Sequence, residues 1–372
     1  MKTTNSSPLR FALVGCGRIA PKHVDALTSG AVPGARLVAV CDIIVERAQA
    51  IANKHPGVQA FKSTREMMES LGAGIDVVTV LTPSGLHARH TVELARFGKH
   101  IVVEKPMALT LQDADTMVQA CDAAGVRLFV VKQNRYNHPV KKLRQALEAG
   151  RFGKLVMGTV RVRWCRTQKY YDQDDWRGTW AYDGGVFANQ ASHHVDLLQW
   201  MMGDVESVFA KTSTALVNIE TEDTGVVILR FKNGALGIIE ATTATRPKDL
   251  EGSISILGEK GSVEIAGFAV NEMRSWNFAD PQADDAEVVE KYRVMPPNVY
   301  GFGHTEYLNK VVESIREGRA ALVDGLEGRK SLELISAIYE SVETGKEVFL
   351  RFVPKKCRLG ILPADRRDSL EL

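Results

Sequence analysis

The first third of the chain alternates short, mostly apolar runs with stretches of helical spacing. The apolar runs, which are rich in β-branched residues, lie at 10–14, 36–41, 75–81, 101–103 and 127–131. The stretches of helical spacing lie between them, at 21–27, 45–54, 88–97 and 111–124. Because strands buried on both faces read as uninterrupted apolar runs, this order predicts an α/β domain with a parallel sheet and right-handed crossovers.

After Tyr136 the pattern changes to strand-like segments separated by turns. A helix with one apolar face is predicted from His138 to Ala149. Strand-like segments follow at 155–164, 207–214, 224–231, 235–243, 253–257 and 262–265. Turns such as Lys232-Asn233-Gly234 separate them, and helical segments are expected at 308–316 and 328–344. The second half therefore predicts an α+β domain with a large, mostly antiparallel sheet.

The composition is that of an ordinary globular protein. The 372 residues suffice for two domains, and the formal net charge of +2 gives no support for binding to nucleic acid or to a membrane surface. The N-terminus lacks an apolar signal segment, and no apolar run approaches the roughly 20 residues of a spanning helix. The five cysteines are scattered without a Cys-x-x-Cys pair, so we expect free thiols, no metal site and a cytoplasmic location.

A glycine loop follows the first predicted strand. Its residues, Gly15-Cys16-Gly17-Arg18-Ile19-Ala20, form the pattern Gly-x-Gly-x-x-Ala. The first glycine permits a tight turn, the second lets the backbone approach a pyrophosphate, and the small third residue lets helix and strand pack closely. The amides of the following helix would point at the phosphates. The loop therefore indicates dinucleotide binding.

Asp42 ends the second predicted strand, at the distance expected for a carboxylate that binds the adenosine ribose. Such a carboxylate would repel a 2′-phosphate. Ile43 and Ile44 follow, where an arginine would welcome that phosphate, so we predict NAD rather than NADP. The alternative is that Asp42 is the N-cap of the next helix, and one residue can serve both roles.

Polar residues follow two further strands of the predicted sheet. Thr82, Pro83 and His87 come after one strand, and Glu104-Lys105-Pro106 after the next. Proline cannot donate to a sheet, so this strand should end near Lys105. Ligands of open α/β sheets lie at the carboxyl ends of strands, where a nicotinamide or its ribose could meet these residues. His87 can equally be an ordinary residue at a helix start.

The segment from Trp164 to His194 is unusually polar and aromatic. A helix is expected to begin at His193, and His193 and His194 lie about 100° apart on it, so periodicity does not decide which faces a pocket. Both can also be helix-start residues bonded locally. Nearby cations suit an anionic substrate or a solvated face: Arg161, Arg163, Arg166, Lys169 and Arg177.

Four motifs thus occur in a fixed order: the glycine loop, Thr82-Pro83 with His87, Glu104-Lys105-Pro106, and Gly184-Gly185 followed by His193 and Asp196. This order closely resembles the Gfo/Idh/MocA family of sugar oxidoreductases. The resemblance implies an NAD-binding Rossmann domain over 1–131 and a substrate-binding and oligomerisation domain with an open-faced sheet over 132–355. A charged tail is expected over 356–372.

Other segments resemble a group within the family that oxidises the C3 hydroxyl of UDP-N-acetylglucosaminuronic acid for bacterial surface polysaccharide. These segments are 132–136, 176–180, 183–185 and 189–194. The resemblance implies a homotetramer in lipopolysaccharide (O-antigen) biosynthesis that holds NAD tightly, with 2-oxoglutarate recycling the cofactor in some members. A diphosphate and a carboxylate would need arginines, and a uracil would suit an aromatic surface.

By resemblance, Lys105 and His193 are the catalytic pair, because His193 precedes Asp196 by three residues. Asn189 stands where the family usually has an aspartate, which questions an Asp–His relay. Cofactor binding is predicted for Gly15, Gly17, Arg18, Ile19, Asp42, Thr82, Pro83, His87, Glu104 and Lys105. Substrate binding is predicted for Lys105, Asn134, Arg135, Arg163, Tyr171, Arg177, Asn189, Gln190 and His193.

The predicted reaction is oxidation of a sugar CH–OH by NAD. A catalytic base needs a pKa near the working pH, which an ordinary imidazole has. We assign His193 as the base and Lys105 as the residue that positions and polarises the hydroxyl, and the reverse assignment stays open. The alternatives are another sugar or inositol dehydrogenase of the family and a catalytically silent NAD-binding regulator. A P-loop hydrolase is excluded because the loop lacks Gly-Lys-Ser/Thr.

Overall fold

The computed structural model describes residues 7–293, 303–351 and 359. Apart from Leu359, the predicted charged tail lies outside these residues. The chain divides into two compact units. The first comprises the chain up to Ala108, Gln112–Val131 and His304–Arg329, and the second comprises Leu109–Leu111, Lys132–Gly303 and the chain from Lys330 onward.

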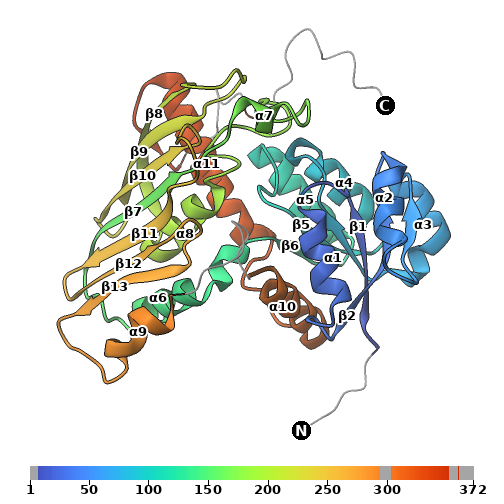
Figure 1. Cartoon of the computed structure of the whole chain (residues 1–372), viewed down its shortest axis with the longest axis horizontal. Coiled ribbons are helices and arrows are strands. Elements are labelled where there is room, and N and C mark those ends of the chain that lie inside the picture. Colours follow the sequence, from blue (N-terminus) through green and yellow to red (C-terminus); the bar gives the residue numbers. More distant parts are fainter. Residues whose placement is uncertain (1–6, 294–302, 352–358, 360–372) are drawn as a thin grey trace. The chain divides into compact units, whose positions relative to one another are not determined.

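The first unit is built on a six-stranded parallel sheet with the order β3-β2-β1-β4-β5-β6 (Figure 1). In chain order the strands are β1 Leu9–Val14, β2 Ala35–Cys41, β3 Gln59–Phe61, β4 Val77–Val80, β5 His100–Val103 and β6 Leu128–Val130. In β5, Ile101, Val102 and Val103 are fully buried, as their uninterrupted apolar run predicts. The strand order reverses between β1 and β4, and ligands of such sheets bind outside the carboxyl ends at this point.

Helices connect these strands. They are α1 Ala20–Thr28, α2 Val45–Ala52, α3 Thr64–Leu71, α4 His87–Ala95 and α5 Leu111–Ala123, with short 3₁₀ turns η1 Gly72–Gly74 and η2 Ser84–Leu86. The predicted parallel α/β domain is confirmed. The strand β3 and the helix α3 were not predicted from the sequence. β3 has only three residues, and Ser63 caps α3 by accepting a hydrogen bond from Glu66 N, a local signal that the apolar pattern does not carry.

A late segment of the chain completes the first unit. It contains α10 Gly303–Glu317 from His304 onward and the start of α11 Gly325–Thr344, which continues into the second unit. Val130 N donates to Val323 O at 3.3 Å, and Arg127 Nη1 donates to Ser314 O at 2.8 Å. The β6 edge of the sheet is therefore covered by residues that the sequence analysis placed in the second domain.

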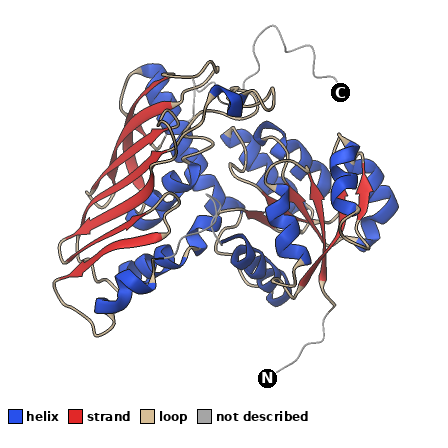
Figure 2. Ribbon diagram, viewed as in Figure 1, coloured by secondary structure: helices blue, strands red, loops and turns tan. Residues whose placement is uncertain are grey.

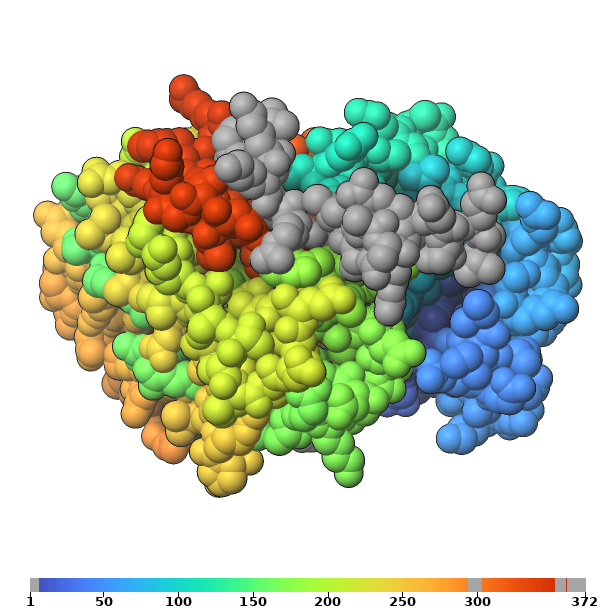
Figure 3. All heavy atoms as spheres, turned by 90° about the horizontal axis from the view of Figure 1, so that it is seen from above, coloured from blue at the N-terminus to red at the C-terminus, as the bar shows by residue number. Residues whose placement is uncertain are grey.

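The second unit is built on an eight-stranded sheet with the order β13-β12-β11-β7-β10-β9-β8-β14. Its strands are β7 Leu155–Arg163, β8 Val205–Ser213, β9 Thr224–Phe231, β10 Leu236–Thr242, β11 Glu251–Gly258, β12 Gly261–Ala266, β13 Glu272–Phe278 and β14 Val348–Phe349. β7 and β10 are parallel, and all other neighbours are antiparallel. The predicted large, mostly antiparallel sheet is confirmed. The strand β14 pairs with β8. In Figure 3 the red atoms, which belong to the end of α11 and to β14, lie beside the yellow-green atoms near β8.

Helices pack on one face of this sheet (Figure 2). The helices of this unit are η3 Gln133–Tyr136, α6 His138–Glu148, α7 Gln168–Tyr171, α8 Ser192–Met202, α9 Asp285–Lys291 and most of α11. The strand β7 alternates buried and partly exposed residues, which is the pattern of a sheet covered on one side. The other face carries exposed apolar side chains, including Val226, Ile228 and Leu236. None of the described helices is long and apolar enough to cross a membrane.

Candidate active site

The glycine loop lies at the carboxyl end of β1. Gly15 has a φ of +98°, and a Cβ there would lie 2.7 Å from the Leu81 carbonyl carbon, so only glycine fits. A Cβ on Gly17 would meet nothing within 4 Å, so the loop is open on that side. Ile19 is the N-cap of α1, after the exposed Arg18. An open backbone followed by the start of a helix is the geometry expected for binding a pyrophosphate, and this contact stays a prediction.

Asp42 connects the glycine loop to the end of β2. Its Oδ2 accepts from Cys16 N at 2.7 Å, and its Oδ1 accepts from Ile44 N at 2.8 Å. The N-cap of α2 is Ile44, without a side-chain cap, so Asp42 does not cap that helix. The carboxylate thus lies beside the loop where the adenosine ribose of a dinucleotide is expected. Its contact with a ribose stays a prediction.

His87 joins the ends of β4 and β5. Its Nε2 lies 2.8 Å from Thr82 O, and its Nδ1 lies 2.8 Å from Pro106 O. The imidazole is buried, and burial lowers its pKa. Thr82 Oγ1 is buried without a hydrogen-bond partner among the described residues, which suits contact with a bound molecule. His87 holds the segments that carry Thr82, Pro83 and Lys105, so their placement depends on it.

Glu104 is a buried carboxylate held by two histidines of the same unit. Its Oε1 lies 2.9 Å from His23 Nε2 and 3.6 Å from His304 Nε2, and its Oε2 accepts from Lys105 N at 3.0 Å. These histidines hold the pKa of Glu104 well below its usual range despite burial. The three side chains have the composition of a metal site, with ligand atoms within 4.8 Å of one another. The 2.9 Å separation is a direct hydrogen bond, so we assign the cluster to holding Glu104 ionised beside Lys105.

In the second unit, His193 and His194 lie in the first turn of α8. His193 Nε2 lies 2.9 Å from Gln133 Nε2. The ring of His194 packs edge-on against Trp164 at 5.8 Å, and both of its nitrogens are buried without a hydrogen-bond partner among the described residues. The two histidines therefore have different surroundings, a polar one for His193 and a core one for His194.

Asp196, one turn further along α8, is fully buried and ionised. Arg135 donates to both of its carboxylate oxygens at 2.8 Å, and Lys132 Nζ lies 3.4 Å from Oδ1. Although burial opposes ionisation, these cations hold the pKa of Asp196 well below its usual value. Arg135 is thus bound to a carboxylate of its own unit. The structure shows that it anchors η3 to α8, and its contact with substrate stays a prediction.

Asn189 and Asp183 form a hydrogen bond in which the Asn189 amide donates to Asp183 Oδ1. Asp183 Oδ2 accepts from Gly178 N at 2.8 Å. The residue that replaces the family's aspartate is therefore engaged with the preceding turn. Asn134 Oδ1 and Gln190 Nε2 are buried without hydrogen-bond partners among the described residues, so both amides have capacity to bind a ligand.

A buried carboxyl group that the sequence analysis missed supports the Gly184-Gly185 turn. Glu222 Oε1 accepts from Tyr339 Oη at 2.9 Å and from Phe187 N at 3.1 Å. A Cβ on Gly185 would lie 2.1 Å from the Glu222 carboxyl, so the turn fits closely over it. Burial raises the pKa of Glu222 to about 7. No local pattern marks Glu222, because its partners are distant in sequence.

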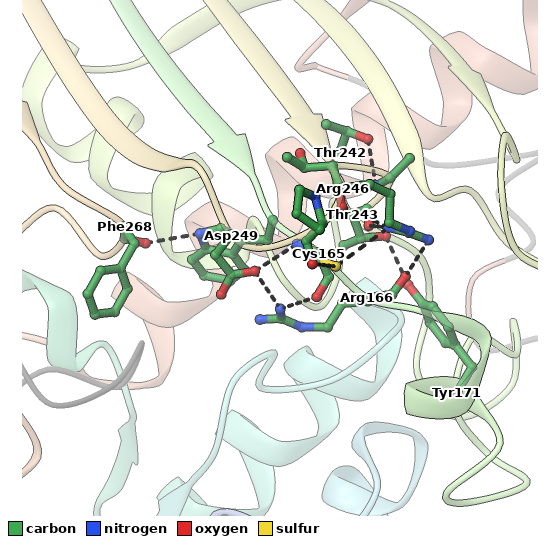
Figure 4. A network of polar contacts seen from close by, with 12 residues as sticks. Cys165, Arg166, Tyr171, Thr242, Thr243, Arg246, Asp249 and Phe268 are labelled. Carbon is green, nitrogen blue, oxygen red and sulfur yellow. Dashed lines mark hydrogen bonds and ion pairs between the residues drawn. The ribbon is translucent and has the colours of Figure 1, made fainter.

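The remaining predicted substrate residues lie in polar networks. Arg163, on β7, donates to Glu240 Oε1 at 2.6 Å, and Arg177 donates to Asp174 Oδ2 at 2.9 Å. Figure 4 shows the network of Tyr171, whose Oη lies 3.1 Å from Thr243 Oγ1. Tyr171 is buried, which raises the pKa of its hydroxyl. Each of these side chains has a partner within its own unit, and their contacts with substrate stay predictions.

The predicted catalytic pair is divided between the units, with Lys105 in the first and His193 in the second. The structure describes each within its own unit. Lys105 follows the buried end of β5 and lies next to the Glu104 cluster. His193 is held by η3 and α8. Their joint action stays a prediction.

Comparisons with known proteins match both units. Residues 9–132 match the family model described as oxidoreductase family, NAD-binding Rossmann fold, and residues 144–350 match its C-terminal alpha/beta domain. The chain is 29% identical to myo-inositol 2-dehydrogenase of Thermotoga maritima over 93% of this chain and 99% of the relative.

Two solved structures are more similar. The WlbA dehydrogenase from Bordetella pertussis, in complex with NADH and UDP-GlcNAcA, has a TM-score of 0.85 and 45% identity over 92% of this chain and 98% of that chain. The WlbA dehydrogenase from Chromobacterium violaceum, in complex with the same two molecules, has a TM-score of 0.86 and 46% identity over 93% and 96%. The first unit is an NAD-binding Rossmann domain, and the protein is an NAD-dependent sugar dehydrogenase. With matches across both units, the chain belongs to the Gfo/Idh/MocA oxidoreductase family.

Proposed function

We propose that this protein oxidises the C3 hydroxyl of UDP-N-acetylglucosaminuronic acid to a ketone with NAD. The similarity at 45% and 46% identity to two dehydrogenases solved with NADH and UDP-GlcNAcA carries this proposal. Both similarities extend over more than nine tenths of the chain.

In the proposed reaction the C3–H bond breaks as a hydride, the hydroxyl O–H bond breaks as a proton, and a C=O bond forms. Bound NAD supplies the hydride acceptor. His193 takes the proton, since a neutral imidazole is a suitable base near neutral pH. Lys105 donates a hydrogen bond to the hydroxyl oxygen and so orients it. Glu104, held ionised by its histidines, fixes the backbone at Lys105 through the 3.0 Å bond to its amide.

The sugar nucleotide carries a diphosphate, a carboxylate and a uracil. Of the predicted substrate residues, Asn134 and Gln190 have buried amide atoms without hydrogen-bond partners among the described residues, and we assign them to neutral groups of the sugar. Arg163 and Arg177 are the cations proposed for the anionic groups. Their present carboxylate partners, Glu240 and Asp174, would be exchanged for substrate oxygens or would remain shared.

The proposal includes the cellular setting that the resemblance implies. The ketone would be consumed in making a diacetamido uronic acid for bacterial surface polysaccharide. The enzyme would act in the cytoplasm as a homotetramer, and 2-oxoglutarate would reoxidise the cofactor in place. Mass photometry tests the assembly. A fall in NADH absorbance on addition of 2-oxoglutarate tests the recycling, because reoxidation converts NADH to NAD.

The deciding experiment is calorimetric titration of the NAD-loaded protein with UDP-N-acetylglucosaminuronic acid, UDP-N-acetylglucosamine and myo-inositol. We expect the uronate to bind best, and mass spectrometry of the product to show a 3-keto sugar. Lys105→Ala and His193→Asn should each reduce turnover while NAD binding is kept. Full turnover in both variants would contradict the assigned roles.

A second candidate is an inositol dehydrogenase, which the 29% identity to myo-inositol 2-dehydrogenase over nearly both full chains favours. Binding and turnover of myo-inositol without binding of either UDP-sugar would select it and reject the nucleotide-sugar proposal. A catalytically silent regulator would bind NAD and turn over none of the three compounds or a wider sugar panel.

A further inference from the structure

Glu222 is a buried carboxyl group that the proposed reaction does not use. It lies just before β9, and its Oε1 accepts from Phe187 N at 3.1 Å and from Tyr339 Oη at 2.9 Å. The same hydroxyl accepts from Gly185 N at 3.2 Å, and Glu222 O accepts from Val186 N at 3.0 Å. Three consecutive backbone amides of the turn, at 185, 186 and 187, are therefore bound by Glu222 or by the tyrosine that donates to it.

The turn passes this placement on to the start of α8. Asn189 N donates to Gly185 O at 3.0 Å, and Ala191 N donates to Val186 O at 2.7 Å. Ala191 is the N-cap of α8. Gln190 lies between these two anchored residues, and its Nε2 is buried without a hydrogen-bond partner among the described residues. A shift of the backbone at 185–187 would therefore move the amide that we assign to the sugar.

The Glu222 carboxyl packs directly against the backbone of the turn. A Cβ on Gly185 would lie 2.1 Å from Oε2, which is itself buried without a hydrogen-bond partner among the described residues. Because Oε1 already accepts two hydrogen bonds, the proton of a neutral Glu222 belongs on Oε2. Ionisation would place charge on a buried oxygen that has no donor, which costs more free energy than burying a neutral hydroxyl.

Only a few titratable groups face this carboxyl. Among the described residues they are Tyr339 on α11 and Asp223, the next residue in the chain. Residues 184–188, which include the turn packed against it, have no titratable side chain. The tyrosine hydrogen bond favours ionisation, whereas burial and Asp223 oppose it. Burial is the largest effect and raises the pKa of Glu222 to about 7, so the group exchanges its proton near neutral pH.

We infer that Glu222, as a neutral carboxyl group, is a positioning residue for substrate binding, which acts through the backbone amides at 185–187 and so places Gln190. This inference rests on the proposed binding of a sugar nucleotide at Gln190. When Glu222 loses its proton, water has to reach Oε2, and the turn has to move because Gly185 covers that oxygen. Loss of the proton therefore lowers the affinity for the sugar nucleotide.

The test is calorimetric titration of the full-length, NAD-loaded protein with UDP-N-acetylglucosaminuronic acid at about pH 6 and about pH 8. Glu222→Gln keeps the shape and an acceptor oxygen but carries no charge at either pH. Glu222→Ala removes the acceptor. Glu206→Gln is the matched control, because Glu206 is an exposed glutamate on β8 of the same unit. Other titrating groups are common to all four proteins, so the comparison of wild type with Glu222→Gln isolates Glu222.

We expect the Kd of the wild type to rise about tenfold from the lower to the higher pH, because the protonated fraction of Glu222 falls from about nine tenths to about one tenth. Glu222→Gln should keep its Kd within about twofold between the two pH values, whereas Glu206→Gln should repeat the wild-type rise. Glu222→Ala should bind about tenfold more weakly than Glu222→Gln at both, since the buried donors lose their acceptor.

Hydrogen exchange followed by mass spectrometry adds a readout that needs no substrate. After correction for the intrinsic exchange rate, peptides that contain residues 185–191 should lose protection at the higher pH in the wild type and keep it in Glu222→Gln.

An equal rise of Kd in wild type and Glu222→Gln would overturn the inference, as would equal protection of the two proteins at both pH values. If circular dichroism shows that Glu222→Ala does not fold, the comparison with Glu222→Gln still decides. If the protein binds none of the sugars, the proposed function fails, and the exchange data still decide whether Glu222 holds the turn.

Discussion

His193 and His194 are neighbours in the same turn of α8 and both are buried, yet the groups around them differ. His193 is within hydrogen-bond distance of Gln133 and lies one turn from the ionised Asp196. His194 is fully buried, and burial lowers its pKa to about 4, so it is neutral at physiological pH. Gly252 of β11 approaches its ring, and a Cβ on this residue would lie 3.1 Å from Nε2.

The difference teaches that the direction of a side chain on the helix decides its function. α8 packs against the sheet strands β7 and β11, and the residue that points to the sheet is sealed in the core. The residue about 100° around the helix points to η3, where buried polar groups gather. A histidine in the core stays neutral as long as the protein is folded. A histidine among polar partners can take up and release a proton.

The two histidines should differ most in their effect on catalytic activity. We expect His193→Asn to lower turnover of the sugar nucleotide by about 10²- to 10⁴-fold, the range for loss of a general base. His194→Asn should keep turnover at temperatures where it is folded, because its ring is away from the polar group around Gln133. Steady-state kinetics at 15 °C, with NADH binding followed by fluorescence as control, measures both. Equal losses in the two variants would contradict the distinction.

The polar side of α8 depends on charge compensation at Asp196. Arg135→Leu should lower the free energy of unfolding by about 3–5 kcal/mol, since it leaves a buried carboxylate without its main cation. Urea denaturation monitored by tryptophan fluorescence measures the change.

Arg144→Leu is the matched control. Both guanidiniums lie over the Trp200 ring, at 4.8 and 4.9 Å, but Arg144 pairs with Glu148, which is 60% exposed. An exposed pair contributes at most about 1 kcal/mol. A loss in Arg144→Leu as large as that in Arg135→Leu would show that stacking on Trp200, and not the buried charge, is responsible.

The core side should appear as a pH dependence of stability. The pKa of His194 is about 4 in the fold, against an ordinary value of 6.5 in the unfolded chain. Between these values the unfolded chain binds the proton and the fold does not, so stability falls as the pH falls from 6.5 to 4. The loss from this group is about 3 kcal/mol, from 1.36 kcal/mol per pKa unit.

Replacing the titrating ring isolates this contribution. His194→Leu should be less sensitive to acid over the same pH window, and the difference between wild type and variant cancels the other titrating groups. Urea denaturation at a series of pH values gives the two curves. Parallel curves across the window would show that His194 does not titrate between the two states as described.

The smallest effect concerns the close fit of His194 against the sheet. Gly252→Ala should destabilise the protein by about 1–3 kcal/mol, because its Cβ would lie 2.4 Å from the Phe268 carbonyl oxygen, a backbone atom that cannot turn aside. Gly72→Ala is the control, since the nearest atom to its Cβ is 3.9 Å away. Thermal unfolding compares them, and equal stability of both variants with wild type would contradict the close packing.

Much of the fold could be predicted from the sequence. The parallel sheet follows from apolar runs such as Ile101-Val102-Val103, which form β5 and are fully buried. The strand β9 begins and ends at Thr224 and Phe231, as the alternation predicts. Family membership, NAD and dehydrogenase chemistry were predicted from motifs and are confirmed by the comparisons. The return of residues 304–329 to the first unit was not predicted, because nothing local in a helix says which domain it covers.

The candidate site was predicted less completely. Lys105 and His193 stand in motifs, and Gly15 is required by its φ of +98°. Gln133, Glu222 and His23 have no such local signal. Gln133 meets His193 across 60 residues and Glu222 meets Tyr339 across 117, so these contacts exist only once the chain is folded.

The sequence by itself determined the two sheets, the glycine loop and the set of chemical groups available for catalysis. Local patterns suffice for these, because strand burial, turn geometry and helix spacing depend on neighbouring residues. Only the tertiary structure decided which histidine faces the core, which amide holds the other, and which carboxylates are ionised. Burial and charge compensation decide these properties, and both come from residues far apart in the chain that share one environment in the fold.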